Sequence, residues 1–309
     1  MKKIYILIFI SSTFWQCAEP TAHNSIPQPY SPFEELSFGT DITLEIITWN
    51  LEEFPKAYTN TVSLVTQAIR ALDVDIIALQ EIESSSYFQN LVDSLDGWSG
   101  YKANSASYNI DLAFLYKTSV IENINIYEIY TNDSRPFPRS PLVLEFEYNS
   151  ENYAVINNHL KCCGNGTIDF SDDWDEDHRR LDAMNLLHDY VSTSFDQTKV
   201  IIVGDFNDEI DDANNNNVFL DFINNPDEYL VTDFEIVEYA TSRYDLSYPN
   251  WESGSHIDHI IITNELFDNF EVNNNKVTIF RLKDYLDGGW SEYDSNISDH
   301  QPIGIKLEF

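Results

Sequence analysis

The chain is poor in basic residues. Only 17 Lys and Arg stand against 52 Asp and Glu among 309 residues, which gives a formal net charge of -35. Non-specific binding to nucleic acid or to anionic membranes depends on neutralising phosphates with Lys and Arg. The composition therefore excludes a protein that coats DNA. Intrinsic disorder is also excluded, because 43% of the residues are hydrophobic and 14% are aromatic, enough for a large core.

Cysteine is scarce as well. The chain has 3 cysteines, Cys17 and the adjacent pair Cys162 and Cys163. Adjacent cysteines cannot link distant segments of one chain, and whether this pair is a strained disulfide or two thiols stays open. Without other cysteine ligands the pair is also a weak zinc signal. The fold must therefore be held by its hydrophobic core.

No apolar run is long enough to span a bilayer, which needs about 20 residues. The run Ile4–Ile10 follows Lys2 and Lys3, and this pattern predicts a cleaved export signal over residues 1–16. Cys17 stands where a bacterial lipoprotein is lipidated, which predicts a membrane anchor; simple cleavage slightly later is the alternative. We expect an exported protein, either held in the bacterial cell envelope or secreted.

Residues 17–40 contain four prolines and no hydrophobic period, so they are predicted to be a linker or tether. From Asp41 the pattern changes, and residues 41–309 are predicted to form one domain. Apolar runs typical of buried strands alternate there with segments of helical spacing. The predicted strands are 42–50, 75–81, 111–116, 142–148, 153–160, 199–207, 256–263 and 302–309, and the predicted helices are 59–72, 84–95 and 178–195.

Several of these apolar strands end abruptly in polar residues suited to metal or phosphate chemistry. Strand ends that meet along one edge of a sheet offer a rigid platform for a site. The residues concerned are Asn50, Glu81, His159, Asp205 with Asn207, and Asp258, and Asp299 and His300 precede the last strand.

Six short strings around these positions resemble, in the same order, the endonuclease/exonuclease/phosphatase superfamily. They are TWNLEEF (48–54), ALQEIE (78–83), NNHLK (157–161), GDFND (204–208), HIDHIII (256–262) and SDHQPI (298–303). Pancreatic-type deoxyribonuclease, abasic-site endonuclease, neutral sphingomyelinase and inositol phosphatases belong to this superfamily. The resemblance implies an α/β fold, a four-layer αββα sandwich of two mixed β-sheets flanked by helices, with the site at one edge.

The resemblance also implies a role for each matching residue. A Mg²⁺ ion, with Mn²⁺ or Ca²⁺ as alternatives, would be bound by Asn50, Glu81 and Asp299, since hard cations prefer oxygen ligands. The catalytic residues would be His159, Asp205, Asn207, Asp258 and His300. Asp205 and Asn207 would orient or deprotonate the attacking water, Asp258 would hold the His300 imidazole, and His159 would stabilise the phosphate or protonate the leaving oxygen.

Basic residues near these motifs are few, so each is informative. Arg139, before a predicted strand, resembles an arginine of the deoxyribonuclease branch that reaches the substrate phosphate, and Lys161 is a second candidate for substrate binding. An ordinary surface salt bridge is the alternative for both. Arg179 and Arg180 follow an acidic run, which predicts a local ion-pair cluster. His256 and His259 receive no functional role.

These observations predict an exported, divalent-metal-dependent phosphodiester hydrolase of endonuclease type that acts by in-line attack of water. The alternative is a phosphoesterase of the same family acting on a lipid or small-molecule ester, like a sphingomyelinase or an inositol-phosphate phosphatase. Segment 244–251 is a modest candidate for lipid contact. A non-catalytic binding module is disfavoured because every catalytic position is present. A monomer is expected.

Overall fold

The computed structural model describes residues 31–106, 109–195, 197–250, 253–271 and 277–309. The predicted export signal, Cys17 and most of the predicted tether lie outside the described residues. Within the described part, no helix is both long and apolar enough to cross a membrane. One compact unit extends from Pro32 to Phe309.

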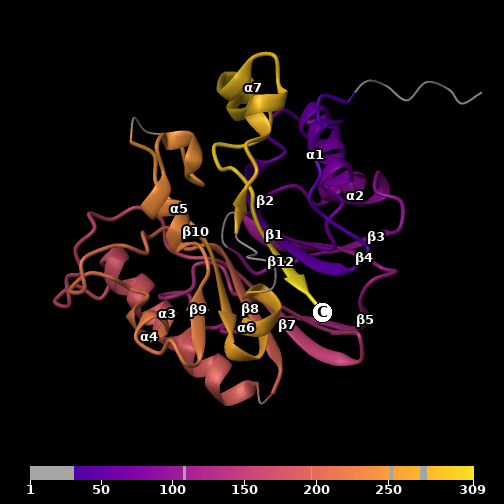
Figure 1. The fold of residues 1–309 in the computed structure, drawn as a ribbon. Helices are drawn as coiled ribbons and strands as arrows, with labels where there is room; N and C mark the ends of the chain where they lie inside the picture. Colours follow the sequence, from indigo (N-terminus) through magenta and orange to yellow (C-terminus); the bar gives the residue numbers. More distant parts are fainter. Residues whose placement is uncertain (1–30, 107–108, 196, 251–252, 272–276) are drawn as a thin grey trace, which may run out of the picture. The chain divides into compact units, whose positions relative to one another are not determined.

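Twelve strands form two mixed sheets of six strands each (Figure 1). In the first sheet the strand order is β11-β12-β1-β2-β4-β3, and β1 and β2 are parallel. Its strands are β1 (Thr43–Phe54), β2 (Ile76–Ile82), β3 (Trp98–Lys102), β4 (Asp111–Lys117), β11 (Thr278–Ile279) and β12 (Ile303–Glu308).

The second sheet has the order β5-β6-β7-β8-β10-β9, and here β7 and β8 are the parallel pair. Its strands are β5 (Glu122–Glu128), β6 (Leu142–Tyr148), β7 (Glu151–His159), β8 (Lys199–Asp205), β9 (Tyr229–Val231) and β10 (Asp258–Thr263). Parallel neighbours place their carboxyl ends at one edge, so each sheet brings two such ends together.

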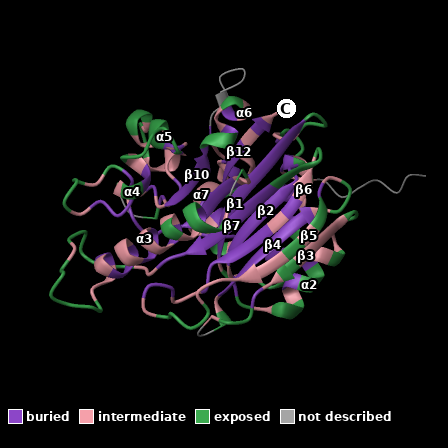
Figure 2. Cartoon of the chain, turned by 90° about the horizontal axis from the view of Figure 1, so that it is seen from below, coloured by how far each residue is buried: buried purple, intermediate pink, exposed green. Residues whose placement is uncertain are grey.

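The sheets pack face to face, and helices cover both outer faces. A central apolar cluster lies between the sheets, one cluster lies under the helices of the first sheet, and another lies under those of the second. Figure 2 shows that the buried residues are concentrated in the central strands. The helices are α1 (Thr59–Leu72), α2 (Ser85–Asp93) and α7 (Gly289–Asn296) on the first sheet, and α3 (Glu176–Ser194) and α4 (Leu220–Ile223) on the second. This is the predicted four-layer sandwich.

Short elements fill the connections. They are α5 (Phe234–Tyr239), α6 (Phe267–Glu271) and the 3-10 turns Arg243–Asp245, Asn264–Leu266 and Leu282–Tyr285. The predicted strands and helices are all present; the helix at 59–72 and the strand at 142–148 have the predicted bounds and the other elements have shifted ends, whereas β3, β5, β9 and β11 were not predicted. β5 reads ENINIYE and lies at a sheet edge, half exposed, so it lacks the apolar run that reveals a buried strand.

The compact unit begins before the predicted boundary at Asp41. Phe33 is fully buried and Leu36 nearly so, and both belong to the cluster under α1 and α2. The proline-rich composition predicted a linker through residue 40, but Phe33 and Leu36 within it pack into the core.

The two sheets are also joined by buried amides. Gln80 Nε2 donates to Asn157 Oδ1 at 2.7 Å, and Asn157 Nδ2 donates to the carbonyl oxygens of Leu79 and Ala113 at 3.0 Å. Both amide side chains are fully buried. A buried amide is stable only when its hydrogen bonds are made, so this bridge favours one alignment of β2 with β7.

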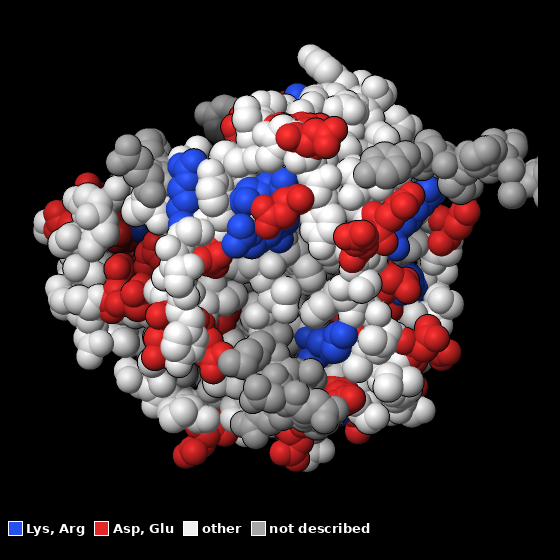
Figure 3. Space-filling view, turned by 45° about the horizontal axis from the view of Figure 1, so that its top comes forward, with Lys and Arg blue, Asp and Glu red and all other residues white. Residues whose placement is uncertain are grey.

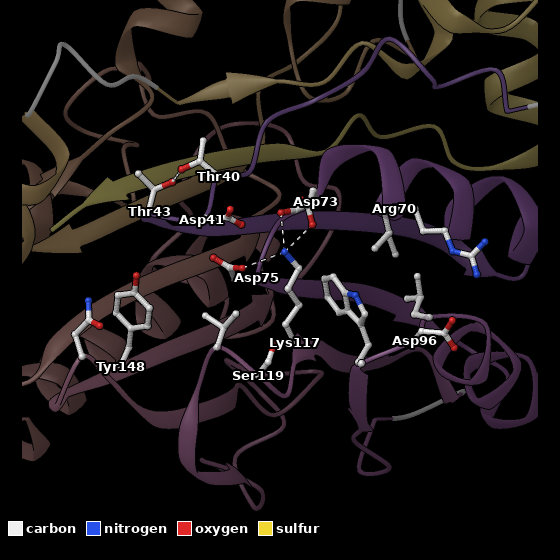
Figure 4. Close-up of a pocket in the computed structure, with 16 residues that line it drawn as sticks. Thr40, Asp41, Thr43, Arg70, Asp73, Asp75, Asp96, Lys117, Ser119 and Tyr148 are labelled. Carbon is white, nitrogen blue, oxygen red and sulfur yellow. Dashed lines mark hydrogen bonds and ion pairs between the residues drawn. The ribbon is translucent and has the colours of Figure 1, made fainter. Parts of the chain in front are cut away.

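A group of acidic residues lies at the starts of β1 and β2, beside a cleft of about 750 Å³ (Figure 4). Asp75 Oδ1 lies 3.3 Å from Lys117 Nζ, which also pairs with Asp73 Oδ1 at 2.8 Å. Asp75 Oδ2 accepts from the Glu45 backbone N at 3.2 Å. Glu45 is fully buried and accepts a hydrogen bond from Thr43 Oγ1. Burial and the nearby Asp75 charge raise the pKa of Glu45 to about 7.

Candidate active site

The first sheet contributes Asn50 and Glu81 from adjacent parallel strands. Asn50 lies beside Gln80 in the β1–β2 register, and the pairing shifts immediately beyond it. Glu81 has a left-handed backbone (φ 60) that turns its side chain out of the regular pleat. Its Oε1 accepts from Asn50 Nδ2 at 3.3 Å and its Oε2 from the Glu53 backbone N at 3.0 Å. Glu81 is thus fixed at the strand end while 19% of its side chain stays exposed.

The second sheet contributes three buried side chains at one level. Asp205 pairs with His159 across the parallel β7–β8 ladder and with Asp258 across the antiparallel β8–β10 ladder. The residue before Asp205 must be glycine, because Gly204 has φ +144 and an added Cβ would lie 2.0 Å from the Asn158 carbonyl oxygen. This close approach of β8 to β7 places the Asp205 carboxylate beside the His159 ring.

Asp205 is where the two sheets meet. Its Oδ2 accepts from Asn50 Nδ2 at 2.9 Å, lies 3.5 Å from His159 Nε2 and lies 3.7 Å from His300 Nε2. His159 Nε2 is also 3.8 Å from Glu81 Oε1. Asn50 of the first sheet, His159 of the second sheet and His300 of the loop before β12 therefore all face the Asp205 carboxylate.

His300 is held from several sides. Its Nδ1 lies 2.7 Å from Asp258 Oδ2, so Asp258 directs Nε2 toward Asp205. Its backbone N donates to Ser298 Oγ at 2.9 Å, and Ser298 Oγ donates in turn to the Asn50 carbonyl at 2.6 Å. The Tyr248 ring covers the imidazole with ring centroids 4.6 Å apart. Asp258 lies where the sequence predicted it, next to His300.

The charges of these groups depend strongly on one another. Burial, together with the charges of Asp258 and Glu81, raises the pKa of Asp205 to about 7, although His300 opposes the shift. Burial opposes protonation of His300, but the charges of Asp258 and Asp205 outweigh it and raise its pKa to about 10. Burial, with the positive charges of Arg139 and His300, lowers the pKa of His159 well below its usual range. At neutral pH the site therefore pairs an imidazolium with a neutral imidazole.

The donor set fits a divalent cation. Asp258 Oδ1 is buried and has no hydrogen-bond partner, and Asp205 is a second buried carboxylate. A carboxylate oxygen of Asp205 and one of Asp258 lie within 4.8 Å of each other and of a His300 ring nitrogen. Glu81 and Asp205 both contact Asn50 and His159, so the two carboxylates lie on either side of the same pair of residues. Such oxygen-rich clusters suit hard cations.

One predicted metal ligand, Asn50, is oriented differently from the expectation. Asn50 turns its amide nitrogen toward Glu81 and Asp205, while its Oδ1 accepts from the Glu52 backbone N at 2.9 Å. Asp299 lies 3.9 Å from His300 Nε2, and its Oδ2 accepts from Asn250 Nδ2 at 3.3 Å. The Asn50 amide would have to rotate by half a turn to offer its oxygen to a cation.

The predicted substrate-binding residues line the strand end after His159. Arg139 Nη1 and Asn207 Nδ2 both donate to the Leu160 carbonyl at 3.3 Å. Asn207 also has a left-handed backbone (φ 55), and its N–H donates to Asp205 Oδ1 at 2.9 Å. Lys161 Nζ donates to the Cys162 carbonyl at 2.8 Å and lies 4.0 Å from Glu176 Oε1. Arg139 and Lys161 are half-buried beside the site.

Arg180 forms the predicted ion-pair cluster. It contacts Asp177 and Asp208 at 2.6 Å each, with all three side chains buried. On the face shown in Figure 3, the drawn Lys and Arg side chains form small separate groups beside acidic ones.

His256 and His259, which received no role from the sequence, are fully buried against Asp233. Asp233 Oδ2 lies 2.8 Å from His256 Nε2 and 2.6 Å from His259 Nδ1. His256 Nδ1 accepts from the Ser247 N–H, and His259 Nε2 faces the Asp208 carbonyl at 2.9 Å. Each ring nitrogen of His256 and His259 therefore has a partner within one ion-paired network. A metal bound to His256 Nε2 would leave that ring without a proton, because Nδ1 already accepts the Ser247 N–H. The network stabilises the far side of β10.

Sequence reasoning also missed the groups that support His300. Tyr293 Oη donates to the His300 carbonyl at 2.6 Å and accepts from Trp49 Nε1 at 3.1 Å, and all three residues are buried. Trp49 and Ser298 lie inside two of the six motifs, so the motif strings contained the signal. Tyr293 lies on α7 and had no local signal.

Comparisons with known proteins agree with the fold described above. The sequence profile of the Endonuclease/Exonuclease/phosphatase family matches residues 47–300. TDP2 from D. rerio, solved in complex with a single-strand DNA product, superposes with a TM-score of 0.63 at 15% identity, covering 86% of this chain and 99% of that chain. The human Nocturnin catalytic domain with a bound sulfate anion gives 0.58 at 15% identity, covering 86% and 94%.

A mannosyl-6-phosphatase from Bacteroides thetaiotaomicron superposes with a TM-score of 0.54 at 13% identity, covering 86% of this chain and 100% of that chain. A search of curated proteins found no match. At these identities the structural likeness establishes the fold.

Proposed function

The chain belongs to the endonuclease/exonuclease/phosphatase family, and from this premise we propose that it is a metal-dependent phosphodiesterase of nuclease type. The family and the buried Asp/His cluster make it a phosphoric ester hydrolase with a candidate site for a divalent metal. The observation that carries the finer proposal is the convergence of His159 and His300 on Asp205 beside Arg139.

The proposed chemistry divides the work among these groups. Mg²⁺ bound near Glu81 and Asp205 would neutralise the phosphoryl oxygens. Asp205 accepts the proton of the attacking water, since its carboxylate lies at the centre of the site, 3.5 Å from His159 Nε2 and 3.7 Å from His300 Nε2. The His300 imidazolium, oriented by Asp258, donates to a phosphoryl oxygen. His159, neutral and beside Glu81 and Asp205, binds the phosphate or the leaving oxygen.

Arg139 and Lys161 support a diester whose chain continues past the reacting phosphate. Arg139, in the loop before β6, and Lys161, just after β7, both contact the segment that follows His159, and we place a second phosphate of the strand beside them. We propose a single-stranded or locally opened nucleic acid, since a net charge of -35 opposes a long duplex footprint. The TDP2 structure with its single-strand DNA product supports this choice.

A second candidate is a small or lipid phosphoester. The acidic surface favours it, and the mannosyl-6-phosphatase shows that the fold accommodates such a substrate. We further propose that the protein is exported, because the export signal predicted from residues 1–16 agrees with a hydrolase of external phosphoesters.

A substrate panel tests the proposal. Purified protein with Mg²⁺ is offered single-stranded DNA, plasmid DNA, bis-p-nitrophenyl phosphate, sphingomyelin, inositol phosphates and sugar phosphates. We expect cleavage of the single-stranded DNA and of the diester, lost in Glu81→Gln and retained in Glu83→Gln. Glu83 is the matched control, an exposed glutamate two residues further along. Activity confined to monoesters or lipid would overturn the nuclease proposal.

A further inference from the structure

Cys162 and Cys163 lie in the wall of the site, just after His159, and the function proposed above does not use them. Both are free thiols, Cys163 exposed and Cys162 half-buried. Their sulfur atoms are 3.0 Å apart, with the Cys163 thiol donating to Cys162 Sγ. Adjacent side chains of an extended strand point in opposite directions, so this contact requires an unusual backbone.

The backbone of the cysteine pair has such an unusual conformation. Cys163 has φ 74, a left-handed conformation that glycine adopts freely and cysteine does not. Gly164 follows with φ +103, and an added Cβ there would lie 2.5 Å from Asp177 Oδ2. Arg180 Nη1 fixes the segment by donating to the carbonyls of Lys161 at 2.8 Å and Cys163 at 2.7 Å. The loop thus holds the two thiols together at a position where glycine would be less strained.

The two sulfurs differ in their surroundings. Lys161 Nζ lies 3.6 Å from Cys162 Sγ, so an ammonium group and the Cys163 thiol both donate to the same sulfur. The hydrogen bond to Cys162 raises the pKa of the Cys163 thiol. A thiol attacks a disulfide as its thiolate, which neighbouring cations favour. This arrangement makes Cys162 the nucleophile and Cys163 the resolving thiol.

We propose that Cys162 and Cys163 form a modification site that closes into a vicinal disulfide by exchange with a disulfide oxidant, and that closure alters the position of Lys161. In the first step Cys162 attacks one sulfur of the oxidant, a Cys162–sulfur bond forms, and the first thiol leaves. In the second step Cys163 attacks Cys162 Sγ and expels the second thiol, which takes the Cys163 proton. Two cysteine thiols are oxidised and one disulfide is reduced to two thiols.

Closure reaches the site through short connections. It converts the sulfur that Lys161 contacts from a thiol into part of a disulfide, and it places the peptide between the cysteines in a ring. Lys161 Nζ also donates to the Cys162 carbonyl, which belongs to that peptide. The Leu160 carbonyl is held by Arg139 and Asn207. This part of the inference rests on the proposed function, in which Lys161 binds substrate. We expect closure to change KM several-fold and kcat less.

Mass spectrometry tests the modification site without any assay of activity. The full chain with Cys17→Ser is incubated with glutathione disulfide, and its mass and free thiols are measured. We expect both thiols to disappear with no glutathione retained, whereas Cys163→Ser should retain one glutathione. Cys162→Ser should react at least tenfold more slowly than Cys163→Ser. Glutathione retained on the parent protein, absence of reaction, or equal rates in the two variants would overturn the proposal.

Kinetics test the link to Lys161. KM and kcat for bis-p-nitrophenyl phosphate are measured before and after closure, in the parent protein and in Lys161→Met. We expect closure to shift KM in the parent and to leave KM of Lys161→Met unchanged. An unchanged KM in the parent, or an equal shift in both proteins, would overturn the coupling. If no substrate is hydrolysed at all, the proposed function fails, while the mass measurement still decides the modification site.

Discussion

The two ends of the parallel pair β1–β2 both bury carboxylates, but they neutralise them differently. At the starts of the strands, Asp75 pairs with Lys117 (Figure 4). Glu45 beside them has a raised pKa of about 7. At the other end, Asp205 is contacted by an amide and two imidazoles. Among the described residues, no Lys or Arg forms an ion pair with Glu81, Asp205, Asp258 or Asp299. The first end supplies a lysine, whereas the second has only the His300 imidazolium against several carboxylates, so a metal cation could balance its charge.

The sharpest test of this difference exchanges a carboxylate for an amide at each end. Asp205→Asn should lower kcat by roughly 10²–10⁴-fold, because the general base is lost. Its unfolding midpoint should stay the same or rise, since a buried acid with a raised pKa has been removed. Asp75→Asn is the matched control and should retain activity. Comparable kcat values for the two variants would refute the functional distinction between the ends.

Metal binding should stabilise only through the catalytic end. A ligand at 100 times its Kd adds about 2.7 kcal/mol to the free energy of unfolding. We expect Mg²⁺ to produce a shift of this order in the parent protein, measured by chemical denaturation with and without chelator. Glu81→Gln should lose most of the shift, and Lys117→Met should keep it. A shift that survives in Glu81→Gln would place the cation elsewhere.

Lys117→Met removes the cation at the other end. Asp75 would stay buried without its partner, and because Lys117 itself is 20% exposed we expect a loss of about 2 kcal/mol in the free energy of unfolding. Denaturation with urea measures the loss. The double variant Lys117→Met with Asp75→Asn should recover part of it. A fall in kcat accompanying Lys117→Met would contradict the independence of the two ends.

The smallest effect should be a pH dependence from Glu45. Its ordinary pKa is 4.5 and its folded-state pKa is about 7. As the pH rises from 4.5 to 7, the unfolded chain loses this proton before the folded chain does, so the stabilising contribution present below pH 4.5 is lost. Glu45→Gln should therefore be more stable than the parent at pH 8. Unfolding curves at several pH values would show the difference narrow toward pH 5; a constant difference would contradict it.

The catalytic end was more predictable from the sequence than the other end. Asn50, Glu81, His159, Asp205 and Asp258 each follow or begin an apolar run, so strand direction alone brings them to one edge. Glu45 sits among apolar residues in β1, but the sequence does not reveal its burial or its neighbour Asp75, because both depend on how β1 and β2 pair.

The other features that the sequence analysis did not predict depend on contacts between residues far apart in the chain. His256 and His259 have no local signal for Asp233, which lies more than twenty residues away. The orientation of the Asn50 amide follows from contacts with residues on both sheets, so the resemblance predicted its place and not its rotation. Short edge strands such as β9 and β11 carry too few residues to show a period.

The amide bridge between Gln80 and Asn157 has a consequence for temperature. The proposed catalytic groups are divided between the two layers of the sandwich, so turnover would require that the layers do not slide past each other. Heating that loosens this contact would separate Glu81 from His159 while each layer keeps its own ladder of hydrogen bonds. We therefore expect activity to be lost on heating below the temperature at which the chain unfolds.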